Sequence, residues 1–105
     1  MAIKNTLLSG SNQNLIPTIA AGASIAVTTI FLCNTSVSAE TVDLYVCEPS
    51  SSPSSTNIVL SSVSIDPDDT FVFSAERMIL SAGSTIQASC STPSVVAATV
   101  SYVDI

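Results

Sequence analysis

The chain has 105 residues, of which 47% are hydrophobic and 10% charged, and two basic against eight acidic residues give a net charge of −6. This length suits one domain with a packed core, and the hydrophobic content excludes intrinsic disorder. Because basic residues are so scarce and His is absent, the composition excludes a phosphate-neutralising nucleic-acid binder, histidine catalysis and histidine metal ligation. A charged helical bundle is excluded for lack of Glu, Lys and Arg.

The first third of the chain predicts strands, because Val, Ile and Thr dominate its apolar runs. We expect a short first strand at 3–8, within a possible N-terminal arm at 1–10, and then a polar loop at 9–14. Segment 15–19 is expected as an edge strand, since its proline cannot donate to a ladder. Segment 24–33 is apolar at both phases of a strand, which predicts a central or doubly covered strand.

The middle of the chain alternates more regularly. Segment 41–47 has Val, Leu and Val on one face, which predicts a half-buried strand. A loop rich in Pro and Ser follows at 49–57. Segment 58–65 predicts a strand with a bulge, because its apolar phase shifts along its length. An acidic turn at 66–69 and a strand at 70–74 come next.

The last third completes an all-β pattern. Segment 75–80 fits either a short helical turn or a strand, whereas 85–91 and 94–105 alternate as strands. Eight or nine short strands at this spacing predict one antiparallel β-sandwich over 1–105, jelly-roll or immunoglobulin-like. The expected inward side chains are Ile30, Leu32, Leu44, Val46, Leu60, Phe71, Phe73, Ile86, Val96 and Val100.

Segment 15–33 also has the length of a membrane span, and the following Val37-Ser38-Ala39 is similar to a signal-peptidase site. Pro17, Gly22 and several hydroxyl residues interrupt the stretch, so we expect it to form strands in the mature chain rather than a span or a cleaved signal. No membrane partner is expected.

Three cysteines, Cys33, Cys47 and Cys90, match no zinc or haem spacing. We expect buried, reduced thiols, which is typical of unpaired Cys in a reducing compartment. A single Cys33–Cys47 bridge between neighbouring strands is the alternative.

The sequence offers no catalytic, cofactor or metal site. There is no Gly-x-Ser-x-Gly elbow and no His to activate a nucleophile, so an enzyme is not expected. Asp66, Asp68 and Asp69 predict a turn, with a calcium site as the alternative interpretation. Glu76 and Arg77 predict either a rim salt bridge or an inter-subunit contact.

The expected surface is dominated by 20 Ser and 11 Thr, and Lys4 is the only lysine. Soluble sandwiches usually protect their strand edges with Lys, Pro or bulges. A charge-poor, strand-rich surface is typical of a protein that packs against copies or partners, and the net charge of −6 keeps the free subunit soluble.

Several segments together resemble small structural proteins of tailed-bacteriophage virions. They are Ala2-Ile3-Lys4-Asn5-Thr6, Cys33-Asn34-Thr35, Thr70-Phe71-Val72-Phe73, the turn from Leu80 to Ala88 and the closing strand from Val96 to Ile105. The resemblance covers nearly the whole chain as a pattern, and Leu-x-x-Gly-x-Thr-Ile-x-Ala is its most specific part. It implies an all-β domain of a head, neck or tail fibre, often a trimer.

Our first hypothesis is therefore a capsid decoration (cement) protein, located in the virion, that forms a homotrimer and binds the major capsid protein on the outside of the shell. A neck, tail or fibre component is the alternative, and an exported adhesin or pilin-like subunit cleaved at Ala39–Glu40 is a further one. The candidate interface residues are Ile3, Lys4, Leu7, Leu8, Glu76 and Arg77.

Overall fold

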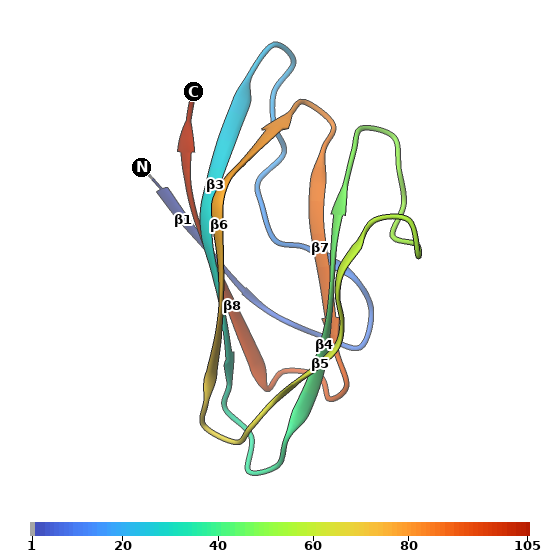
Figure 1. Cartoon of the computed structure of the whole chain (residues 1–105), viewed down its shortest axis with the longest axis vertical. Helices are drawn as coiled ribbons and strands as arrows, with labels where there is room; N and C mark the ends of the chain where they lie inside the picture. The colour runs from blue at the N-terminus through green and yellow to red at the C-terminus, as the bar shows by residue number, and fades with distance from the viewer. Residues whose placement is uncertain (1) are drawn as a thin grey trace.

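The computed structural model describes residues 2–105 and every side chain among them except those of 75–77. Its eight strands form two four-stranded antiparallel sheets that face each other (Figure 1). The first sheet has the order β1-β8-β3-β6 and the second β2-β7-β4-β5. The strands are β1 (Ala2–Leu7), β2 (Gln13–Asn14), β3 (Ser24–Asn34), β4 (Glu40–Cys47), β5 (Ile58–Ile65), β6 (Thr70–Ser81), β7 (Thr85–Cys90) and β8 (Val96–Asp104).

The strand order is that of a jelly roll. The paired strands are β1 with β8, β2 with β7, β3 with β6 and β4 with β5, as in one long hairpin rolled into two layers. Strands that follow each other in sequence lie in opposite sheets, except for β4 and β5. The predicted all-β sandwich is therefore confirmed, and the jelly-roll alternative fits the topology better than the immunoglobulin-like one.

The core lies between the sheets and is filled by one alternate set of side chains from each strand. Six of the ten predicted inward residues are fully buried, and Val46, Leu60, Phe71 and Phe73 are partly buried against them. The six are Ile30, Leu32, Leu44, Ile86, Val96 and Val100.

Segment 15–19 is not a strand, so that prediction is wrong. Its backbone crosses from β2 to β3. The side chains of Leu15, Ile16 and Ile19 are buried and close one end of the core. The Leu15 N–H still donates to the Ile86 carbonyl oxygen at 2.7 Å, but Pro17 prevents the ladder of backbone hydrogen bonds from continuing. The short pairing of β2 was missed because polar residues 13 and 14 resemble a loop.

The N-terminal segment is a sheet strand in this structure rather than a free arm. Residues 2–7 alternate, and their backbone pairs with β8 along the whole of β1. The next residue, Leu8, is 1% exposed and belongs to the core, which removes it from the candidate interface. Deleting this segment would therefore damage the fold.

Two further features concern β5 and β6. The bulge predicted in 58–65 is confirmed by register shifts between β4 and β5, and Ser62 has a positive φ of 49°. Segment 75–80, for which the sequence left two alternatives, continues β6 as a strand.

The apolar stretch 15–33 forms the crossing segment and most of β3. Within residues 2–105 the structure contains no helix with the length and apolarity that crossing a membrane requires.

Candidate functional site

The outward face of the first sheet carries a cluster of exposed apolar side chains. β1, the part of β3 from Thr29 on, and β6 over 70–74 alternate, so each presents a second set of residues on the side away from the core. The exposed large residues of this face are Ile3 (64%), Leu7 (51%), Phe31 (40%), Val72 (48%) and Ile79 (63%).

The strand register aligns these residues in rows across the four strands. Phe31 in β3 lies between Thr99 of β8 and Val72 of β6, and Asn5 of β1 flanks Thr99. A hydrogen bond of 2.9 Å from the Thr99 hydroxyl to Asn5 Oδ1 reinforces this central row. The two neighbouring rows are Leu7, Ala97, Cys33, Thr70 and Ile3, Ser101, Thr29, Ser74.

These three rows contain aliphatic, aromatic, thiol, hydroxyl and amide groups and no charge. Hydroxyl and aliphatic groups cost little to remove from water compared with ions, so such a face can be covered without burying a charge. We name the set of these three rows the uncharged face, and Ile79 lies further along β6, beyond Glu76 and Arg77, whose side chains lie outside the described residues. Several exposed large apolar side chains on one face, with no charge among them, are typical of an interaction surface.

The candidate interface residues that the sequence predicts lie in different places in the structure. Ile3 and Leu7 lie in the uncharged face, and both side chains are exposed. Lys4 is half-buried on the opposite side of β1, in register with the buried Val100. The side chains of Glu76 and Arg77 lie outside the described residues.

The sequence did not single out Phe31, Val72 and Ile79. Phe31 belongs to segment 24–33, which is apolar at both phases and is therefore predicted to be covered on both faces. Val72 lies in the predicted strand 70–74, and Ile79 lies in segment 75–80, for which the sequence leaves a helical turn and a strand open. β3 is indeed central in its sheet, but Phe31 is 40% exposed, so its outer face is uncovered.

A second polar cluster lies where β4 begins. The buried Glu40 carboxylate accepts hydrogen bonds from the Ser91 hydroxyl at 2.6 Å and the Ser36 hydroxyl at 3.3 Å. Hydrogen bonding, first from Ser91 and then from Thr92, lowers the pKa of Glu40, against the opposing effect of burial. These bonds join the β3–β4 and β7–β8 loops, which indicates a structural role.

Asn34 serves the same end of the sandwich. Its side chain is fully buried and donates from Nδ2 to the carbonyl oxygens of Ser38 and Ile65, both at 2.9 Å. Its Oδ1 accepts the Ser36 N–H at 2.9 Å. The amide thus holds the β3–β4 loop to the end of β5.

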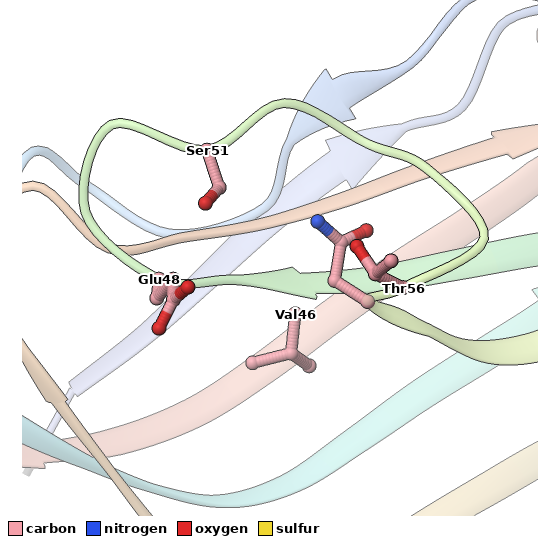
Figure 2. A pocket seen from close by; sticks show the side chains of 5 residues that line it. Val46, Glu48, Ser51 and Thr56 are labelled. Carbon is pink, nitrogen blue, oxygen red and sulfur yellow. The ribbon is translucent and has the colours of Figure 1, made fainter.

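A shallow cavity of about 290 Å³ lies beside the β4–β5 loop, which arches over it in Figure 2. Ligand pockets usually have at least this volume and converging free polar groups. The amide of Asn57 is already engaged, because it donates to the Ser52 carbonyl at 2.9 Å and accepts the Ser54 N–H at 2.9 Å. The lining residues are Val46, Glu48, Ser51, Thr56 and Asn57.

The acidic turn forms a local hydrogen-bonded loop, in which Asp69 Oδ1 accepts the Thr70 N–H at 2.9 Å. In the described part of the chain no three Cys, Asp or Glu residues gather closely enough to hold a metal ion. Cys33, Cys47 and Cys90 are free thiols. Cys33 and Cys47 lie in different sheets, each near the carboxyl end of its strand. Because β4 begins next to the end of β3 and runs away from it, Cys47 lies toward the other end of the sandwich, which does not favour a bridge between them.

No known protein family, characterised protein or solved structure matches this chain. Its function must therefore be inferred from its own residues. Among the features described, the uncharged face is the largest one whose chemistry calls for a partner.

Proposed function

We propose that this chain is a structural protein of a tailed-phage virion, and specifically a capsid decoration protein that covers part of the outer shell. The observation that carries the proposal is the uncharged face, which extends over all four strands of one sheet. Such a face gains free energy when apolar area is removed from water and loses little to ion desolvation.

The charge distribution supports a role in assembly. The chain has a net charge of −6, yet the rows of the uncharged face contribute nothing to it. Repulsion between free subunits therefore acts through other surfaces and favours solubility before assembly, while the face itself is free to be covered.

The fold supports the proposal by analogy alone. Jelly rolls are common among viral capsid domains, but they also occur in lectins and cupins. The mechanism we propose is mechanical. Each copy would cover a joint between shell subunits, so that opening the joint under internal pressure would expose the buried apolar surface.

The exported-subunit alternative is disfavoured by the position of its cleavage site. Cutting the Ala39–Glu40 bond would remove β1, β2 and β3, and β3 is a central strand of the first sheet. It would also place a new amino terminus at the buried Glu40.

The first experiment is to count copies of this chain in purified phage particles by quantitative mass spectrometry. A simple stoichiometric ratio to the major shell protein is the result expected for decoration. A much lower number would contradict decoration and favour the neck, tail or fibre alternative. Absence from the particle would contradict the virion assignment altogether.

The second experiment tests the face. We expect Leu7→Thr with Phe31→Thr to reduce occupancy on particles about tenfold or more, since two apolar contacts of about 1 kcal/mol each are lost. The control is Val37→Thr with Val59→Thr, which truncates two exposed valines elsewhere, 95% and 44% exposed. Equal occupancy for the two double variants would contradict a role for the uncharged face.

A further inference from the structure

The two edge strands of the first sheet leave backbone groups unpaired in a defined pattern. In an antiparallel pair, residues alternate between pointing their N–H and C=O groups toward the partner strand and away from it. The Leu8 N–H donates to the Val96 carbonyl at 2.9 Å, which fixes this alternation in β1. The backbone groups of Ile3, Asn5 and Leu7 therefore point away from β8.

The same reasoning applies to β6 at the other edge. The Asn34 N–H donates to the Asp69 carbonyl at 2.9 Å, so the backbone groups of Val72 and Ser74 point away from β3. The Thr70 N–H, which belongs to the same outward-pointing set, already donates to Asp69 Oδ1.

The edges of the second sheet are protected. β5 carries the bulge at Ser62, whose N–H donates to Asp43 Oδ1 at 2.7 Å instead of pointing into solvent. β2 has only two residues, and Pro17 follows shortly after it. Bulges, short strands, proline and charged side chains such as Lys are the usual protections against edge pairing. β1 over 2–7 and β6 over 70–74 pair regularly and contain no proline, and the register shift of β6 against β3 lies beyond this stretch, between Ser74 and Met78.

The regular stretches of these two edges, 2–7 in β1 and 70–74 in β6, are complementary. β1 is antiparallel to β8, β8 to β3, and β3 to β6, so β1 and β6 run in opposite directions. A second copy rotated about an axis parallel to the strands would bring its β1 antiparallel to β6 of the first. The shared rows then set Asn5 opposite Val72 and Ile3 opposite Ser74.

We propose that copies of this chain associate head to tail, with β1 of one copy hydrogen-bonded to β6 of the next. This goes beyond the proposed function, since it specifies how copies join one another whatever particle they bind. Because β1 and β6 are different surfaces, the contact is heterologous and each copy contributes one of each edge. It would continue the uncharged face from one copy to the next.

Lys4, the charged residue within the stretches 2–7 and 70–74, is compatible with this pairing. Its N–H points toward β8, because Lys4 alternates with Asn5. Its side chain lies on the opposite side of β1 from the uncharged face. The long alkyl stem lets the ammonium group reach water beside a paired strand.

Proline substitutions test the pairing, because proline removes an N–H and is tolerated at an edge strand where that N–H faces solvent. We expect Val72→Pro and Asn5→Pro each to abolish the association that the full-length wild-type chain shows in sedimentation velocity. Val72→Thr and Asn5→Ser keep the N–H and serve as matched controls that associate like wild type. A monomeric wild-type chain, or association that survives either proline, would overturn the proposal.

Mixing the two proline variants gives the decisive outcome. Val72→Pro retains an intact β1 and Asn5→Pro an intact β6, so we expect an equimolar mixture to form a one-to-one dimer although each variant alone is monomeric. An unfolded variant would not complement. If association were instead through two like edges, the variant that keeps this edge intact would associate by itself, and the head-to-tail proposal would be wrong.

Hydrogen exchange on the wild-type chain gives a check that needs no variant. In a monomer the amides of Asn5 and Val72 have no backbone acceptor and exchange rapidly. We expect their protection to rise with protein concentration, by at least about tenfold. Rapid exchange of both amides at concentrations where the chain is associated would overturn the pairing, while leaving attachment to a shell as a separate question.

Discussion

Asn34 is the residue whose side chain does most to fix the β3–β4 loop. It is fully buried, and its amide supplies two donors and one acceptor at 2.9 Å to backbone groups. A carboxylate of the same size cannot donate to the Ser38 and Ile65 carbonyl oxygens. We expect Asn34→Asp to lower the free energy of unfolding by about 2–4 kcal/mol. Urea denaturation would measure this, with Asn57→Asp in an exposed loop as the control, at under about 1 kcal/mol.

Glu40 makes the stability of this end of the sandwich depend on pH. Hydrogen bonds from Ser91, then Thr92, hold its pKa below the ordinary value of 4.5. Its contribution is therefore fully present above about pH 4.5 and is lost as the pH falls through the folded-state pKa. We expect wild type to be more stable than Glu40→Gln at pH 7 and the difference to disappear in acid.

Thermal unfolding between about pH 3 and pH 7 would check this. Ser91→Ala removes the largest cause of the lowered pKa and should reproduce part of the Glu40→Gln effect. A difference between wild type and Glu40→Gln that is independent of pH would mean that the carboxylate acts only through its shape.

At the scale of elements, the irregular segment 15–19 is as much a part of the core as any strand. Leu15 is fully buried at the end of the sandwich, where β2 crosses to β3. We expect Leu15→Ala to destabilise the chain by about 2–5 kcal/mol, because it leaves a cavity. Val37→Ala truncates an almost fully exposed residue and should change stability by less than about 0.5 kcal/mol. Similar effects in chemical denaturation would contradict the role of 15–19 as a plug.

The two sheets differ in whether their edge strands can pair with another chain. The second sheet closes its edges with a bulge at Ser62 and a two-residue strand. The first sheet leaves regular unpaired rows on β1 and on β6 over 70–74, and its outer face is uncharged over three rows. Both proposals therefore concern the same sheet, one through its edges and the other through its face.

At the scale of the whole molecule, the net charge leads us to expect that salt strengthens self-association. Its net charge of −6 opposes association, while the rows that would meet contain no ion pair that salt could break. Raising NaCl from about 0.05 to about 0.5 M should therefore strengthen self-association about two- to fivefold, by screening repulsion. Sedimentation equilibrium would measure the change, and dissociation by salt would indicate contacts between charged groups.

Much of the sandwich follows from the sequence, because the alternation of burial along a strand is a local property. Segments 41–47 and 85–91 alternate clearly, and both form strands as predicted. Their predicted inward residues are buried, except that Val46 is only partly buried. The bulge in 58–65 follows equally from a shift in apolar phase. Ile3 and Leu7 were identified as candidate interface residues because they lie near a terminus and are apolar, and both are exposed.

Only the tertiary structure decided the strand order and the outer face. Pairing of β1 with β8 joins residues almost a whole chain apart, and no local pattern encodes such a partner. Where both phases of a strand are apolar, as around Phe31, alternation cannot say which side faces the core, and the packing of the second sheet decides it. Leu8 and Leu15 were misjudged for the same reason, since their burial depends on what closes over the end of the sandwich.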